Sequence, residues 1–312
     1  MKNNYKQIEK FLSSNSFISK NIVKDIEYYE KDGYRYSKIL FFNERVSIDN
    51  EDFEYQINSK GFRGKDFNEF NSNNINILFA GCSQTLGVGL PEKNTWYSKL
   101  SNKIHLLHKE KDVDFYNLGV NGGGIELAIK NVMAFIKSGN VPNYLFLFLP
   151  ESSRSVVFSK GTGKFECYLI SSDSNEQEEY YKNYIHENKL FTNFILLSML
   201  EEICKAHGIE LLWTSWDVDE NNMYSQSSFN NFFIMDKDLK YHMVKEPVGD
   251  NFPNNNYLTK KDHELQISYF NKLYKNKDNE PYWHCARDGN HYGSAASNFI
   301  AEKFMLELIR RR

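Results

Sequence analysis

The chain has 312 residues, of which 41% are hydrophobic and 25% are charged, a composition typical of a globular protein. Its 38 Lys and Arg residues nearly balance its 41 Asp and Glu residues, and the formal net charge of -3 gives no electrostatic reason to expect nucleic acid or an anionic membrane as a partner. This length suits one large α/β domain with additions, or two modest domains.

The cysteines and the N-terminus indicate the compartment. Cys82, Cys167, Cys204 and Cys285 are scattered and form no C-x-x-C pair, which is typical of reduced thiols. The N-terminus lacks the apolar stretch of a secretory signal, and no apolar run is long enough to span a bilayer. We therefore expect a soluble, cytoplasmic protein without a membrane span, and release by a non-classical route stays open.

The chain begins with an extension and then alternates between two kinds of segment. Residues 1–73 form the N-terminal extension, with a hairpin expected around 46–64. Nearly continuous apolar runs predict buried parallel strands at 75–80, 113–118, 144–149 and 209–216. Amphipathic patterns predict helices at 94–108, 124–137, about 180–207, and 294–310.

This alternation predicts an α/β fold with three layers, α/β/α, around a central, mostly parallel sheet. Ligand sites in such sheets lie beyond the carboxyl ends of the strands. The polar stretch at about 217–283 is too long for a simple connection, so we expect an insertion beside the site. The residues that begin the loops at this edge are Gly81, Gly119, Pro150 and Asp217.

The first core strand runs into GlyCysSerGlnThrLeuGly at 81–87, which then opens into a helix. A serine in such a turn exposes its hydroxyl at the mouth of the sheet, and its backbone N–H points into the same space. Ser83 is therefore a candidate nucleophile. A helix cap uses the same residue type, so this turn alone leaves both interpretations open.

A second candidate segment, ArgAspGlyAsnHisTyrGly at 287–293, lies immediately before the last helix. Asp288 and His291 are three residues apart and can project into the same cleft. A histidine there can accept the proton of a serine, while a neighbouring carboxylate orients the imidazole. The chain order Ser, Asp, His also suits a base delivered by the last loop.

With these segments in place, the chain resembles the SGNH/GDSL hydrolase superfamily, in its Gly-Cys-Ser-Xaa-Thr-Xaa-Gly variant. The resemblance covers the core from about 75 to 312, apart from the insertion, and implies the flavodoxin-like SGNH hydrolase fold for a domain at 74–312. GlyPheArgGly at 61–64 also resembles a segment often found upstream of the first block. The matching blocks are 81–87 followed by ThrTrp at 95–96, AsnLeuGlyValAsnGlyGlyGly at 117–124, and AspGlyAsnHisTyrGly at 288–293.

The resemblance implies a role for each matching residue. Ser83 would be the nucleophile, His291 the general base and Asp288 the acid that orients it. The backbone N–H groups of Ser83 and Gly122 would form the oxyanion hole. No cofactor and no metal is implied.

Two positions depart from the family pattern. Cys82 stands where the family usually has Asp before the serine. The third block usually reads Gly-Xaa-Asn-Asp, and its Asn donates to the oxyanion, but this chain has LeuProGluSerSerArg at 149–154. Ser152 or Asn121 would then have to supply the missing donor, whose loss typically costs roughly 3–4 kcal/mol of transition-state stabilisation.

These residues favour a serine esterase that removes a small acyl group, such as acetyl, from a carbohydrate or another polar scaffold. Aromatic residues at 213–283 would line the site, although most aromatic residues in a chain of this size fill the core. The alternative is a catalytically degenerate domain that binds or builds a larger assembly, whose partner would contact the extension or the insertion.

Two further interpretations use the same residues. His284, Cys285, Asp288 and His291 include zinc-ligand types, but their spacing matches none of the common ligand patterns. The glycines at 119–124 suggest a phosphate-binding loop, but no Lys-Ser/Thr follows them.

Overall fold

The computed structural model describes residues 54–152, 154–159, 164–169, 186–235 and 291–312, together with two strands at 26–31 and 34–39. Its central sheet has four parallel strands in the order β5-β4-β6-β9. All four predicted core strands are confirmed, and their bounds agree within one residue. They are β4 (Ile75–Gly81), β5 (Val113–Gly119), β6 (Tyr144–Leu149) and β9 (Glu210–Ser215).

The predicted helices are also confirmed, although residues 180–185 of the third lie outside the described residues. None of the described helices is long and apolar enough to cross a bilayer. The long helices are α3 (Trp96–Leu107), α4 (Ile125–Lys137), α6 (His186–His207) and α10 (Ser294–Arg310). The short ones are η1 (Phe67–Glu69), α2 (Ser83–Leu86), η2 (Glu92–Asn94) and α7 (Val218–Tyr224).

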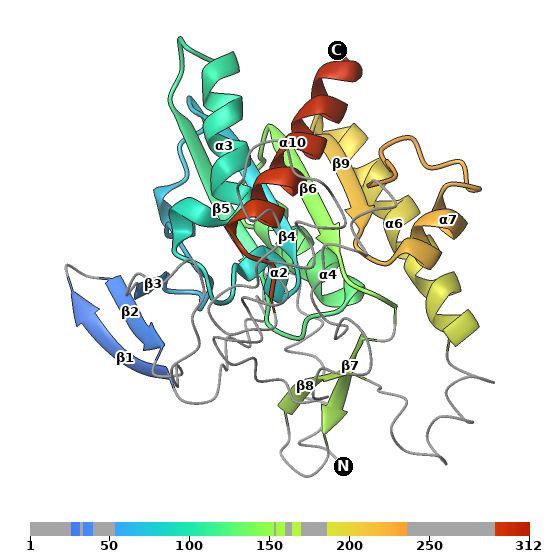
Figure 1. The fold of residues 1–312 in the computed structure, drawn as a ribbon, viewed down its shortest axis with the longest axis horizontal. Helices are drawn as coiled ribbons and strands as arrows, with labels where there is room; N and C mark the ends of the chain where they lie inside the picture. Colours follow the sequence, from blue (N-terminus) through green and yellow to red (C-terminus); the bar gives the residue numbers. More distant parts are fainter. Residues whose placement is uncertain are drawn as a thin grey trace, which may run out of the picture.

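The helices cover both faces of the sheet, because side chains alternate between the faces along each strand. From β4, Leu78 joins the cluster that contains α4 and α6, and Phe79 joins the cluster that contains α3 and α10. Figure 1 shows α3 and α10 together on one side of the sheet. The expected three-layer α/β/α architecture is therefore confirmed.

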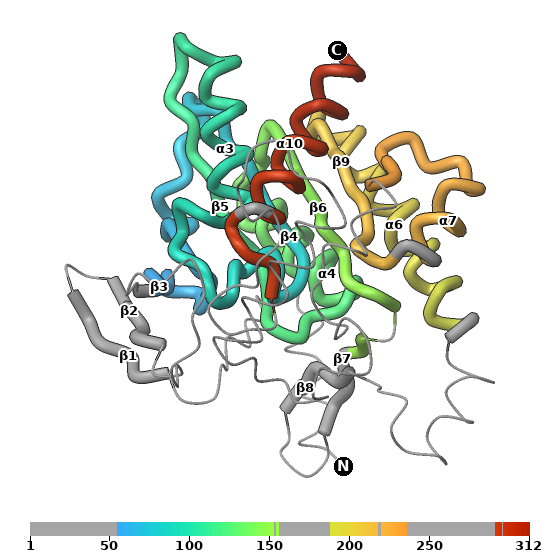
Figure 2. The backbone as a smooth tube through the Cα atoms, in the orientation of Figure 1, coloured from blue at the N-terminus to red at the C-terminus, as the bar shows by residue number. Residues whose placement is uncertain are grey.

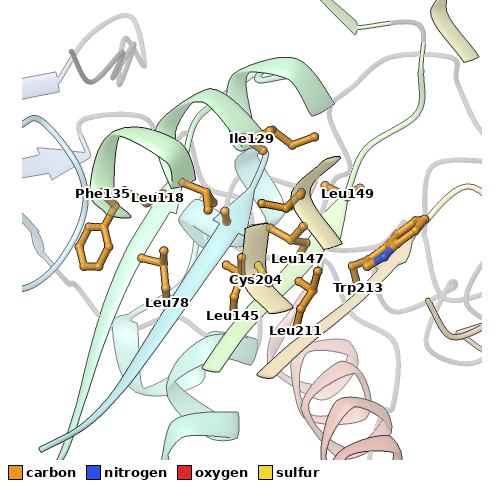
Figure 3. Close-up of a cluster of buried hydrophobic side chains, with 14 of the residues drawn as sticks. Leu78, Leu118, Ile129, Phe135, Leu145, Leu147, Leu149, Cys204, Leu211 and Trp213 are labelled. Carbon is orange, nitrogen blue, oxygen red and sulfur yellow. The ribbon is translucent and has the colours of Figure 1, made fainter. Parts of the chain in front are cut away.

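Both faces of the sheet are apolar, as parallel strands buried between helices require. Figure 3 shows one face, where leucines of all four strands meet α4 and α6. On the other face Trp96 stacks on Phe304, with ring centroids 5.1 Å apart, and this contact joins α3 to α10. The last helix is thereby fastened to the helix that follows the first block.

A smaller antiparallel sheet precedes the core: β3 (Glu54–Ile57) pairs with β2 (Tyr34–Ile39), and β2 pairs with β1 (Ile26–Lys31). Residues 46–53 of the hairpin expected around 46–64 lie outside the described residues. In the rest of that segment the chain folds back on itself, with an antiparallel bridge between Ile57 and Arg63. The pairing of β3 with β2 was not predicted.

Two other segments complete the described structure. An unpredicted antiparallel hairpin, β7 (Arg154–Ser159) and β8 (Lys164–Leu169), follows the loop after β6. Helix α7 lies in the segment predicted as an insertion, and residues 236–283 of that segment are outside the described residues.

Candidate active site

Ser83 begins helix α2, directly beyond the carboxyl end of β4. Cys82 is extended, with φ -97° and ψ -152°, and its carbonyl oxygen accepts hydrogen bonds from the N–H groups of Thr85 and Leu86 at 3.0 and 2.9 Å. Ser83 is only 4% exposed. The first N–H groups of a helix have no partner within the helix, and no described residue accepts a hydrogen bond from the Ser83 N–H.

Gly81 allows this turn to fold back over the sheet. A Cβ atom at Gly81 would lie 2.3 Å from the carbonyl oxygen of Phe148 and 2.4 Å from Thr85 Oγ1. Both distances are far inside van der Waals contact, so a side chain here would separate α2 from β6. The close approach of β4, α2 and β6 therefore depends on this glycine.

The second block locks α2 against the end of β5. A Cβ atom at Gly119 would lie 2.2 Å from the backbone nitrogen of Leu86. Beside it the Asn117 amide donates to the carbonyl oxygen of Thr85 at 2.8 Å, and Asn117 Oδ1 accepts from the Gly119 N–H at 2.7 Å. The AsnLeuGly sequence thus satisfies buried backbone groups of two loops at once.

The turn after β5 carries the other oxyanion candidates. The Gly123 N–H donates to the Val120 carbonyl oxygen at 2.9 Å, and Gly122 has φ +69°, a conformation that favours glycine. Asn121 and Gly122 are both partly exposed. Within the described ranges no acceptor is bonded to the Gly122 N–H. The turn therefore leaves this donor available at the same sheet edge as Ser83.

The loop after β6 touches the second block. A Cβ atom at Gly124 would lie 2.7 Å from the carbonyl oxygen of Arg154. In this loop Ser152 is 1% exposed, and its N–H donates to Glu220 Oε1 at 2.5 Å. The Ser152 hydroxyl is buried as well, beside the Glu220 carboxyl. Its two donors are thus covered or already engaged, whereas Asn121 is partly exposed.

Glu220 is a buried acid that the sequence did not single out. Burial raises the pKa of its carboxyl from 4.5 to about 7, the N–H and hydroxyl of Ser152 lower it, and Asp217 and Glu151 raise it. Asp217 caps α7 by accepting from the Glu220 N–H at 2.9 Å. The spacing of Asp217 and Glu220 is that of a capping box, which could have located the helix but not the contact with Ser152.

A hydrogen bond joins the last block to the first. The Tyr292 N–H donates to Gln84 Oε1 at 3.1 Å, so the residues that follow His291 and Ser83 are bonded to each other. Figures 1 and 2 show the segment entering α10 in red, and Figure 1 labels α2 beside it. The Tyr292 ring lies 6.2 Å from Phe148, and burial, with Cys82 and Glu151 nearby, raises its pKa well above the ordinary value. Gln84 and Tyr292 were not among the predicted site residues.

The catalytic and oxyanion-hole roles of the predicted residues stay predictions. Asp288 lies outside the described residues, as do His284 and Cys285 of the alternative zinc site. In the described part of the chain no three His, Cys, Asp or Glu side chains are grouped to hold a metal ion. Cys82 and Cys204 are free, buried cysteines.

Comparisons with known proteins give matches among solved structures alone. No family model matches the chain, and no curated protein matches its sequence. Among solved structures it is similar to the psychrotrophic esterase EstA from Pseudoalteromonas sp., with 13% identity, a TM-score of 0.36, and 76% of this chain and 98% of that one covered. It is similar to the acetyl xylan esterase AlAXEase at 14% identity and a TM-score of 0.35, covering 75% and 100% of the two chains. It is also similar to a member of the lipolytic protein G-D-S-L family from Veillonella parvula at 14% identity and a TM-score of 0.32, covering 76% and 99%.

Proposed function

We propose that this chain is a serine esterase of the SGNH/GDSL type, with Ser83 as its nucleophile. One observation supports this most: the ends of β5 and β6 and the last block meet around α2, through the close approaches at Gly81 and Gly119 and the hydrogen bond from Tyr292 to Gln84. Acyl transfer needs a hydroxyl, backbone N–H donors and a base at one site, and Ser83, Gly122 and His291 are our candidates for these roles.

In the proposed mechanism, the Ser83 hydroxyl attacks the ester carbonyl carbon while His291 accepts its proton, and Asp288 orients His291. The N–H groups of Ser83 and Gly122 hold the oxyanion of the tetrahedral intermediate. His291 then returns the proton to the departing alcohol, which leaves the acyl group on Ser83. A water molecule, deprotonated by His291, attacks this acyl-enzyme and releases the acid.

The third oxyanion donor is the open part of this proposal. Asn121 and Ser152 are the two candidates, and we favour Asn121 because it is partly exposed in the turn after β5. Ser152 is 1% exposed and already gives its N–H to Glu220. The same burial of Ser152 also favours the alternative, a degenerate domain that binds or builds an assembly, because a missing donor would weaken catalysis.

The test is labelling by a fluorophosphonate together with turnover of p-nitrophenyl acetate. We expect Ser83→Ala to abolish labelling and to lower turnover by at least about 1,000-fold, because the covalent step is lost. Ser225→Ala, at an exposed serine, is the matched control and should behave as the wild type. A wild type that neither labels nor turns over the ester would favour the degenerate domain.

The substrate proposal is a small acyl group, such as acetyl, on a carbohydrate or another polar scaffold. It is motivated by the aromatic residues near the carboxyl end of β9, where Arg154 lies over the Trp216 ring at 5.4 Å. Acetylated oligosaccharides should be hydrolysed in preference to p-nitrophenyl esters of long-chain acids. A preference for long acyl chains would contradict this part of the proposal while leaving the esterase itself intact.

A further inference from the structure

Arg63 is a charged residue buried beneath the turn that carries Ser83. It is 1% exposed, and its guanidinium carbon lies 4.3 Å from the centroid of the Tyr55 ring. It comes from the GlyPheArgGly segment of the N-terminal extension, outside the α/β core. A buried cation is costly unless it is well bonded, so its hydrogen bonds indicate its role.

These hydrogen bonds go to the backbone just after α2. Arg63 Nη1 donates to the carbonyl oxygens of Leu86 and Gly87 at 3.2 and 2.8 Å, and Nη2 donates to that of Leu90 at 2.9 Å. The last carbonyl groups of a helix have no partner within the helix, and a buried one left unpaired is destabilising. A planar guanidinium can hold several such oxygens in fixed directions, which a lysine ammonium cannot do.

Tyr55, on β3, fastens the same loop from a second side. Its hydroxyl accepts a hydrogen bond from the Gly89 N–H at 2.7 Å. Gly87 and Gly89 both have positive φ, +75° and +79°, so the loop has an unusual backbone that depends on outside support. A Cβ atom at Gly87 would lie 3.0 Å from Arg63 Nη1, which shows how closely the guanidinium fits against the loop.

The loop is in turn bonded to Ser83. The Ser83 carbonyl oxygen accepts hydrogen bonds from the N–H groups of Gly87 and Val88 at 3.0 and 3.2 Å. Gly87 therefore joins Arg63 to the candidate nucleophile, because its carbonyl bonds the guanidinium and its N–H bonds Ser83. A shift of residues 86–90 would move the Ser83 backbone and change the direction of its N–H group.

We propose that Arg63, supported by Tyr55, is a positioning residue that holds Ser83 and its oxyanion-donating N–H in the reactive geometry. This inference rests on the proposed esterase function and assigns a role in that site to the N-terminal extension. Arg63 acts only through the backbone of residues 86–90. Since a displacement of about 1 Å can cost roughly 100-fold in rate, its effect on the chemical step should be large.

The experiment measures fluorophosphonate labelling of Ser83 in two ways, as the final labelled fraction and as the rate constant. We expect Arg63→Met to lower the rate constant by about 100-fold and Arg63→Lys by about tenfold. Tyr55→Phe, which removes the hydroxyl that accepts from the Gly89 N–H, should lower the rate constant by about fivefold. In all three variants the labelled fraction should equal that of the wild type.

The two readouts separate positioning from folding. A lower labelled fraction with an unchanged rate constant would overturn the proposal, because it would mean that Arg63 only keeps molecules folded. An unchanged rate constant in Tyr55→Phe and Arg63→Lys would also overturn it, and these milder variants carry the test if Arg63→Met does not fold. Arg310→Met, at an arginine whose side chain is 74% exposed, is the matched control and should leave both readouts unchanged.

A failure of the esterase proposal is recognised separately, by a wild type that is not labelled at Ser83. Amide hydrogen exchange of residues 84–90 then tests the contacts of Arg63 with this backbone and needs no enzymatic activity. We expect exchange at least about tenfold faster in Arg63→Lys than in the wild type, because local opening becomes easier. Equal exchange in the two proteins would overturn the role of Arg63.

Discussion

The turn after β4 and the loop after β6 leave neighbouring strands at the same sheet edge, yet different groups hydrogen-bond their backbones. In the turn, Arg63 and Asn117 satisfy carbonyl groups of residues 85–90. In the loop, the N–H and hydroxyl of Ser152 face the buried carboxyl of Glu220 on α7, and burial raises the pKa of that carboxyl to about 7. Ser83, the proposed nucleophile, thus lies on a backbone whose carbonyl groups are paired, while the adjacent loop contacts a carboxyl that can titrate.

The largest expected effect comes from breaking the contact that holds the turn. Gly119→Ala would place a Cβ atom 2.2 Å from the Leu86 nitrogen, so α2 must move away from β5. We expect a loss of about 3 kcal/mol or more in the free energy of unfolding, measured by urea denaturation, and a fall in esterase turnover of about 100-fold.

The matched control is Gly139→Ala. A Cβ atom there meets nothing within 4 Å, but the backbone has φ +94°, so this variant reports the conformational strain alone. Gly139→Ala should lower the free energy of unfolding by about 1–2 kcal/mol and leave turnover unchanged. Equal losses for the two variants would mean that the tight contact at Gly119 contributes nothing specific to the turn.

The second prediction concerns the titratable loop. Burial raises the pKa of Glu220 from 4.5 to about 7, so the folded protein holds a proton that the unfolded chain releases. The stability from this group is fully present below pH 4.5 and is lost as the pH rises through about 7, by roughly 3 kcal/mol. Glu220→Gln removes this loss, because an amide does not titrate.

Urea denaturation at pH 5 and pH 8 measures this effect. Between pH 5 and pH 8 the free energy of unfolding of Glu220→Gln should gain roughly 2–3 kcal/mol relative to that of the wild type. Glu202→Gln, at an exposed glutamate on α6, is the control and should show no such gain. If Glu220→Gln follows the wild-type pH dependence, the carboxyl does not hold a proton near neutral pH.

The smallest effect is expected at the hydrogen bond between the first and last blocks. Gln84→Ala removes the acceptor of the Tyr292 N–H and should lower kcat by about fivefold with little change in KM, since one neutral hydrogen bond is lost. Gln84→Glu keeps an acceptor oxygen and should retain most of the activity. Steady-state kinetics with p-nitrophenyl acetate measure both variants, and a change in KM alone would indicate that Gln84 contacts the substrate instead.

Much of the architecture was readable in the sequence because its signals are local. Buried parallel strands leave apolar runs, and helices leave a repeating apolar face, so β4, β5, β6, β9 and the four long helices were predicted within a few residues. The hairpin at 154–169 was missed because each of its strands is only six residues long and mixes polar with apolar residues. The partner of β3 was also missed, since strand pairing across the chain leaves no local pattern.

In the candidate site, too, some residues were indicated by local sequence and others only by tertiary contacts. Ser83, Gly122 and His291 could be singled out because serine, glycine and histidine occur in turns after a strand or before a helix. Their roles stay predictions, as does that of Asp288, which lies outside the described residues. Gln84, Tyr292 and Glu220 were not found. Their roles depend on contacts with residues at least 68 positions away, which no spacing in the sequence reveals.

By itself, then, the sequence determined which strands form the sheet and which serine follows the first of them, because burial and turn chemistry act within a few residues. Only the tertiary structure decided what holds that serine in place. The carbonyl groups after α2 could be satisfied by many partners, and the folded chain places the guanidinium of Arg63 there. It likewise decided that Ser152 faces a buried carboxyl, because packing brings α7 against the loop after β6.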